Sequence, residues 1–278
     1  MALRGRDLVP FLIVPARNRS AVTPELLPTD SSPLFEVDPQ KLEHREFLSL
    51  VQKLDDLTFS PMGLEMPGWV FYDCGVMPGI VLGYGAKASK LRPWIRRVLG
   101  VKPGYEGLVP LTLFIAIAML PERSWLVNTL TGLDDVAPGA TVEGLVRRTL
   151  AAGLFVLPVD HLYGTVQWRS RTLPRYTALG ALQVLTAWTP AHDILSTLTF
   201  KVDLSPNSGA LLWRGVEGIN PETPAPNRVV DVDNSLDLQA VQSWLEDGAK
   251  VELVAPPLNV GRHTLGLLRY EKGGVDDS

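Results

Sequence analysis

The pairing most suited to acid–base chemistry in this sequence is a histidine followed by an aspartate. His192 and Asp193 lie in a short loop, after Thr-Pro-Ala at 189–191 and between two apolar segments. Histidine exchanges protons near neutral pH, and a carboxylate bonded to one ring nitrogen orients the other as a general base. Neighbouring side chains often point apart, so an ordinary loop accounts for the pair equally. We keep His192 and Asp193 as candidate catalytic residues.

Patterns for metal binding and covalent catalysis are missing from the sequence. The other histidines, His44, His161 and His263, form no HxH, HxxxH or HExxH spacing with one another or with His192. The single cysteine, Cys74, excludes an intrachain disulfide and a cysteine-based zinc site. Neither a GxSxG elbow nor a GxxxxGK[ST] phosphate loop occurs. We therefore expect no metal and no covalent enzyme intermediate.

A glycine-bearing turn at 138–141 could hold an anion. It precedes an apolar-periodic segment at 142–152 that predicts a helix, with Thr141 as its N-cap. Unpaired amides and the positive end of the dipole at a helix start can bind pyrophosphate. Any loop that enters a helix shares this pattern, and Asp134 and Asp135 just before it oppose an anion. The candidate cofactor-binding residues are Pro138, Gly139, Ala140 and Thr141.

One basic cluster stands out from the rest of the sequence. Its members are Lys87, Lys90, Arg92, Arg96 and Arg97, and all but Lys87 lie in a predicted short helix that spans 89–99. A solvated helix face explains such a cluster. The functional alternative is an anion site for a phosphate or an acidic partner.

Composition limits the class of protein. The chain has 278 residues, of which 46% are hydrophobic and 20% charged, so it folds around a core. Its formal net charge of −4 argues against general nucleic-acid binding, although it leaves a local basic cleft open. The expected partner is a small-molecule substrate, with no nucleic acid, and the formation of a homo-oligomer is left open.

The apolar segments of the chain indicate strands rather than a membrane span. The run at 8–14 contains Pro10, stops at Pro15 and lacks a small-residue cleavage site, so it predicts a buried strand rather than a signal peptide. The longest apolar stretch, at 108–120, is too short for the roughly 20 residues that cross a bilayer. The sequence therefore predicts a cytoplasmic protein without a membrane span.

The order of the predicted elements indicates an α+β fold. Helices are expected at 39–57, 142–152 and 236–246, the last capped by Asn234 or Ser235, and a helix passing into a strand at 173–185, with Gly180 as the break. Strands are expected at 69–76, 80–84, 111–118, 125–130, 154–159, 198–204 and 251–254. This order predicts a mixed, mostly antiparallel central sheet with flanking helices.

A proline- and glycine-rich stretch at 205–228 predicts a linker. The predicted division is a main α+β domain at 1–204, the linker, and a small C-terminal α/β module at 229–278.

The elements from 111 to 185 support a family resemblance. Two strands, the turn DDVAPGAT, the helix VEGLVRRTLAAG, the strand LFVLPV and the segment SRTLPRYTALGALQVL follow one another. This order, within 65–204, resembles the core of the GNAT acyltransferase family. In that family a splayed strand leads into a pyrophosphate loop of pattern R/Q-x-x-G-x-G/A and a helix, and a strand and an LYxxxGF-like segment follow. The turn at 138–141 stands at the loop, and RYTALGA at 175–181 stands at the second segment.

The resemblance implies a GNAT-like core that binds a coenzyme A thioester and transfers its acyl group to an amine. It places Tyr176 where these enzymes often hold the general acid that protonates the departing thiolate, although a core aromatic is the other interpretation of Tyr176. Two alternatives stay open, a non-catalytic binding protein for an apolar or acyl ligand and a structural or assembly subunit. The hydrophobic content, seven tryptophans and the lack of a catalytic constellation suit the binding protein.

Overall fold

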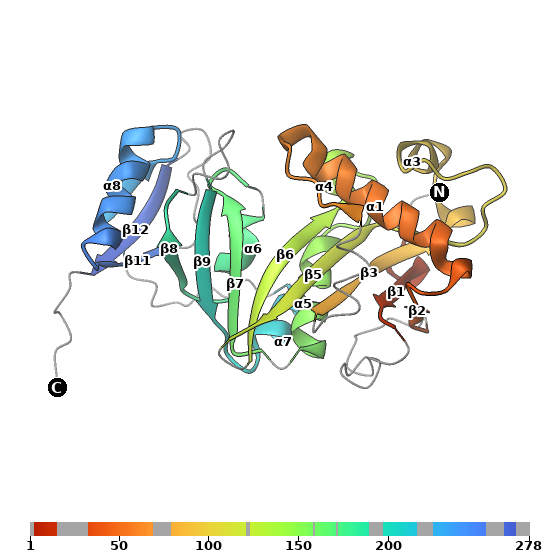
Figure 1. The fold of residues 1–278 in the computed structure, drawn as a ribbon, viewed down its shortest axis with the longest axis horizontal. Coiled ribbons are helices and arrows are strands. Elements are labelled where there is room, and N and C mark those ends of the chain that lie inside the picture. The colour runs from red at the N-terminus through yellow and green to blue at the C-terminus, as the bar shows by residue number, and fades with distance from the viewer. Residues whose placement is uncertain are drawn as a thin grey trace. The chain divides into compact units, whose positions relative to one another are not determined.

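The chain divides into two compact units. The computed structural model describes residues 3–15, 33–68, 79–120, 123–157, 159–170, 172–188, 197–215, 225–253 and 264–270. The first unit comprises Met1–Glu122 and Val127–Pro158, and the second comprises Arg123–Leu126 and Val159–Ser278. Each unit combines a sheet with helices and is described by itself (Figure 1).

The sheet of the first unit has the order β6-β5-β3-β1-β2, with β4 also paired to β3. β3 runs antiparallel to β1, β4 and β5, whereas β1 and β2 run parallel. β6 begins in the second unit and ends in the first. The strands are β1 (Leu8–Ile13), β2 (Phe35–Val37), β3 (Gly79–Lys87), β4 (Leu108–Pro110), β5 (Thr112–Met119) and β6 (Ser124–Gly132).

Helices cover the central strands of this sheet. Successive residues at the start of β5 are all buried, and because successive side chains point to opposite faces, both faces of β5 must be covered. Helix α1 (Arg45–Phe59) packs against β4 and β5, and helix α5 (Leu145–Val156) packs against β3 and β5. In Figure 1, α1 lies in front of the strands. Two short helices, α3 (Pro93–Val98) and α4 (Leu133–Val136), complete the unit.

The prediction of a buried strand at 8–14 is confirmed. β1 is buried as an inner strand, and its Phe11 ring meets Phe47 of α1 edge-on, with 5.0 Å between the ring centroids. Among the described residues, no helix is both long and apolar enough to cross a bilayer. The predicted strand at 69–76, which contains Cys74, lies outside the described residues.

The boundaries predicted for the helix after the glycine turn are wrong. α5 starts at Leu145, with Gly144 as its N-cap at φ 72°, so Thr141 caps nothing. Gly153 lies inside α5, where a Cβ would approach the Phe114 ring to 2.6 Å, so Gly153 allows close packing and does not end the helix. The strand predicted at 154–159 is also wrong, because the apolar run continues α5 to Val156. A short apolar run does not distinguish a strand from the end of a buried helix.

The sheet of the second unit is antiparallel, with strand order β10-β12-β11-β8-β9-β7. β9 is the last of three consecutive strands, yet it pairs with both β7 and β8 and lies between them. The strands are β7 (His161–Gln167), β8 (Leu182–Thr186), β9 (Thr197–Asp203), β10 (Arg228–Asp231), β11 (Lys250–Leu253) and β12 (Thr264–Tyr270).

The described part of this unit includes the helices α6 (Leu173–Thr177), α7 (Ser208–Arg214) and α8 (Ser235–Glu246). The predicted helix-to-strand passage around Gly180 is confirmed by α6 and β8. The cap at Asn234 is also confirmed, since its side chain accepts a hydrogen bond from the Leu236 amide at 3.1 Å. The buried Trp168 donates its indole N–H to the Ala187 carbonyl at 2.7 Å.

The fold class is therefore the predicted one, α+β with mostly antiparallel sheets and flanking helices. The boundaries between the two compact units lie outside the predicted linker at 205–228. That stretch contains α7 and the first residue of β10. The three-part domain division stays a prediction.

Candidate functional site

The turn predicted to bind a cofactor lies between α4 and α5. Gly139 takes a left-handed conformation with φ 76°. The Ala140 amide donates to the Ala137 carbonyl at 3.0 Å, and the Thr141 amide donates to Oδ1 of Asp134 at 3.0 Å. Because both amides are satisfied inside the turn, they are not the open donors expected from the sequence. The helix start, with its donors, lies a few residues further on at Gly144.

The start of α5 carries a positive charge. Gly144 has no side chain with which to cap the first turn, and no acidic residue lies in that turn. The guanidinium of Arg147 folds back over Gly144, with Nη2 3.1 Å from the point where a Cβ would stand. A cation at the positive end of a helix is electrostatically unfavourable. Nε of Arg147 is buried and has no hydrogen-bond partner among the described residues.

Arg92 joins the basic cluster to this turn. Its Nη2 donates to the Gly139 carbonyl at 2.8 Å, and its guanidinium lies over the Trp94 ring at 5.5 Å from the centroid. No local pattern links Arg92 to Gly139, because the contact joins residues 47 positions apart.

The two guanidinium groups and the uncapped helix start make the turn at 137–144 chemically suited to an anion. Guanidinium groups form charge-assisted hydrogen bonds with phosphate oxygens, and helix amides add further donors. Asp134 and Asp135 are both engaged locally, on the amides of Thr141 and Gly132 respectively. The donor set fits a phosphate or pyrophosphate group.

Tyr176 lies on α6 in the second unit. Its side chain is only 5% exposed, and its ring lies 4.7 Å from that of Phe200 between centroids. Burial raises the pKa of the Tyr176 hydroxyl above its usual range, so the phenol keeps its proton at neutral pH. A protonated phenol is the form that a general acid needs.

The other catalytic candidates cannot be placed. His192 and Asp193 lie outside the described residues, as does His263. His161 has its Nδ1 2.6 Å from Oδ1 of Asp203, a carboxylate that Lys201 also contacts at 2.8 Å. Within the described ranges, no three His, Cys, Asp or Glu side chains come together as a metal site.

A buried carboxylate on α1 was not predicted from the sequence. Asp55 is 0% exposed; its Oδ2 accepts the Met66 amide at 3.0 Å, and its Oδ1 has no hydrogen-bond partner in the described part of the chain. Burial, and secondarily the nearby carboxylates of Asp56 and Glu65, raises the pKa of Asp55 to about 6. The available signal was its spacing, because Asp55 follows the buried Val51 by four residues on the apolar stripe of the helix.

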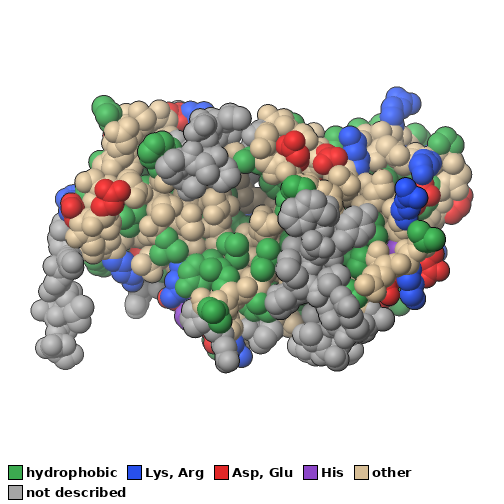
Figure 2. Space-filling view, viewed as in Figure 1, with side chains coloured by type: hydrophobic (Ala, Val, Ile, Leu, Met, Phe, Trp, Pro, Cys, Tyr) green, Lys and Arg blue, Asp and Glu red, His purple; other side chains and the backbone are tan. Residues whose placement is uncertain are grey.

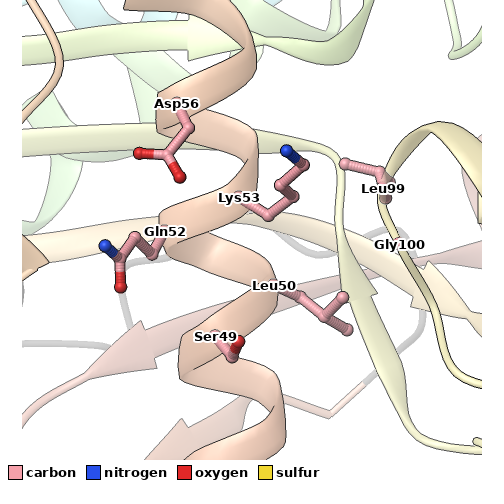
Figure 3. A pocket seen from close by; sticks show the side chains of 7 residues that line it. All are labelled: Ser49, Leu50, Gln52, Lys53, Asp56, Leu99 and Gly100. Atoms are coloured by element: carbon pink, nitrogen blue, oxygen red, sulfur yellow. The ribbon is translucent and has the colours of Figure 1, made fainter. Parts of the chain in front are cut away.

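A pocket of about 340 Å³ opens beside α1 (Figure 3). One wall is the polar side of α1, and the other is the turn that follows α3. The close-up shows the Lys53 and Leu50 side chains on the side of α1 that faces Leu99, and Gln52 on the other side. The lining residues are Ser49, Leu50, Gln52, Lys53, Asp56, Leu99 and Gly100.

Comparison with known proteins gives structural likenesses but no match in sequence. No protein-family model matches the chain, and no curated protein sequence matches it. A chain of the NatC complex, solved bound to Gag peptide and CoA, is similar at a TM-score of 0.40 and 10% sequence identity. The match covers 60% of this chain and 97% of that chain.

Proposed function

We propose that the protein is an acyltransferase that moves an acyl group from a coenzyme A or carrier thioester to an amine. The observation that carries this proposal is the cationic, uncapped start of α5, with Arg147 folded over Gly144 and Arg92 bonded to Gly139. A pyrophosphate bound there would compensate both guanidinium charges and the helix dipole. The order of elements supports it in part, because β5, β6, the turn, α5 and α6 follow one another as in the family resemblance. β7 stands in place of the strand expected at 154–159, which is the end of α5.

The proposed reaction needs no covalent bond between the protein and the acyl group. The amine nitrogen attacks the thioester carbonyl carbon, the carbon–sulfur bond breaks, and the thiolate leaves. Backbone donors that polarise the carbonyl oxygen stabilise the charge that develops on it. Arg92, Arg147 and the first amides of α5 would hold the donor molecule through its phosphates.

The departing thiolate takes up a proton, for which the family resemblance makes Tyr176 the candidate donor. Burial keeps the phenol protonated at neutral pH, which is the form that a general acid needs, but the same raised pKa makes it a weaker acid. The proton that the amine loses goes to a base, for which His192 and Asp193 are the candidates. A small-molecule amine is the expected acceptor.

Calorimetric titration with coenzyme A and acetyl-coenzyme A tests the proposal. We expect binding near the micromolar range, and Arg147→Gln should weaken it by about 10- to 100-fold, the value of one charge-assisted hydrogen bond. Arg45→Gln, at the start of α1, is the matched control and should bind as the parent does. No binding at millimolar ligand would refute the donor assignment.

Tyr176→Phe separates binding from chemistry. Removing the hydroxyl should leave the affinity for coenzyme A unchanged while lowering the rate of acyl transfer by about 100-fold or more, the usual range for general acid catalysis. An unchanged rate with an amine that the parent acylates would remove Tyr176 from the mechanism.

A further inference from the structure

We propose that the segment 87–102 and the adjoining pocket on α1 form a binding surface for single-stranded nucleic acid. The segment comprises the end of β3, helix α3 and the turn after it. Its cations offer contacts for phosphates, and its exposed tryptophan offers a surface on which a base can stack. The pocket at its end offers contacts for the edge of a base. This inference does not depend on the proposed acyltransferase activity.

The segment 87–102 is strongly basic. The residues from 87 to 105 include no Asp or Glu, whereas the segment 87–102 holds six cations, Lys87, Lys90, Arg92, Arg96, Arg97 and Lys102. Five of them are exposed and the sixth, Arg96, is half-buried. Figure 2 shows Lys and Arg side chains gathered around the end of the first unit that carries α3.

Most of these cations form no ion pair with the described residues. Lys90 lies 3.8 Å from a carboxylate oxygen of Asp7, and Lys102 lies 3.5 Å from one of Glu46. The other four cations have no ion pair among the described residues. Four positive charges on one short segment, unpaired within the described part of the chain, create a local field that the net charge of the chain conceals.

An aromatic ring stands among these charges. Trp94 is 37% exposed, and the Arg92 guanidinium lies over its ring. Proteins that bind single strands combine a basic track with aromatic side chains on which bases stack, and arginine adds cation–π attraction. The bases of a duplex are already stacked, so an exposed ring favours unpaired strands.

The pocket provides the third contact. Leu99 and Gly100, which follow α3, line it together with Gln52, Lys53 and Asp56 of α1. Lys53 lies on the side of α1 that faces Leu99, so its ammonium could donate to the hydrogen-bonding edge of a splayed base. The volume of about 340 Å³ lies at the lower end of the range for small-ligand pockets.

The same surface is poorly suited to a membrane. Peripheral attachment needs apolar side chains that enter the lipid alongside the cations. In this segment Leu91, Ile95 and Leu99 are buried in the protein, which leaves Trp94 as the one exposed large apolar side chain of the described surface here. Nucleic acid needs no such insertion, because its affinity comes from phosphate charge and stacking.

Fluorescence anisotropy with a labelled 20-nucleotide single-stranded RNA tests the proposal. Single strands lose affinity by about 0.7 logarithmic units per phosphate contact for each tenfold rise in salt. Four contacts therefore predict a slope of about −3, or about 50-fold weaker binding at 200 mM than at 50 mM salt. Arg96→Glu with Arg97→Glu should weaken binding more than 10-fold and roughly halve the slope.

The control is a double variant with the same charge change in the second unit, Arg214→Glu with Arg228→Glu, at two exposed positions. It should bind as the parent does. Trp94→Ala should abolish the preference for single-stranded over double-stranded RNA while leaving the salt slope unchanged, and circular dichroism checks that each variant folds.

Several results would overturn the proposal. One is the absence of any anisotropy change at micromolar protein in 50 mM salt. A second is equal weakening of RNA binding by the two double variants. A third is binding to anionic phospholipid vesicles without binding to RNA. Full displacement of the RNA by saturating coenzyme A would also overturn it, because the surface would then belong to the donor site. RNA binding without any coenzyme A binding would support it and refute the acyltransferase instead.

Discussion

Replacing Asp55 by asparagine should stabilise the protein at pH 8. The pKa of this buried carboxyl is raised from 3.8 to about 6, mainly by burial. Each pKa unit corresponds to 1.36 kcal/mol, so ionised Asp55 costs about 3 kcal/mol of folding free energy above pH 6. The amide oxygen of the introduced side chain could still accept the Met66 amide, and its NH₂ group carries no charge to bury.

The pH dependence follows from the sign of this shift. Because the folded-state pKa lies above the unfolded one, the folded state binds the proton more tightly. The cost is absent below about pH 4, grows as the pH rises from 4 to 6, and is complete above that window. The parent should therefore lose stability across this window, whereas Asp55→Asn should be flatter and more stable at pH 8 by about 1 to 3 kcal/mol.

Urea denaturation at pH 5 and pH 8, with hydrogen exchange of the Met66 amide as a local probe, measures both effects. Asp56→Asn is the comparison at the neighbouring, half-buried position; because the Asp56 carboxylate contributes to the raised pKa of Asp55, this variant should reduce the pH dependence only in part. Asp55→Ala should destabilise the protein at both pH values, since it removes the acceptor of the Met66 amide. If Asp55→Asn were less stable than the parent at pH 8, the reasoning would be refuted.

Three further predictions concern stability and organisation. Gly153→Ala should cost about 1 to 3 kcal/mol, measured by thermal unfolding, because its Cβ would overlap the Phe114 ring; an unchanged midpoint would contradict the packing. Asn234→Ala should cost about 1 kcal/mol and speed hydrogen exchange of the Leu236 amide, and a loss without faster exchange would argue against the cap. Limited proteolysis should cut first within 205–228 if that stretch is a linker, and a resistant stretch would count against the predicted domain division.

Much of the secondary structure followed from local patterns. The strand at β1, the passage from α6 to β8 and the Asn234 cap each depend on a few neighbouring residues, so their signals are present in a short window. α5 was placed with wrong ends, because its limits depend on contacts that a window does not contain. The helix was predicted to end at residue 152, whereas Gly153 lies inside it and admits the Phe114 ring from β5.

The site was harder to anticipate than the fold. Local reasoning found the glycine turn, but the amides that it expected to be open are bonded within the turn. The features that now characterise the site come from distant pairs, above all Arg92 with Gly139. Asp55 was overlooked because a single polar residue on an amphipathic helix has no distinctive pattern until its burial is known.

The position of β9 affects how the second unit can be made. β9 supplies the partner of both β7 and β8, yet it emerges from the ribosome after them. Until residue 203 has been synthesised, β7 and β8 each have an edge that lacks its eventual neighbour, and an open edge can pair with another chain. A nascent or truncated chain that stops before Thr197 should therefore aggregate, and completion of this sheet depends on a strand that arrives late.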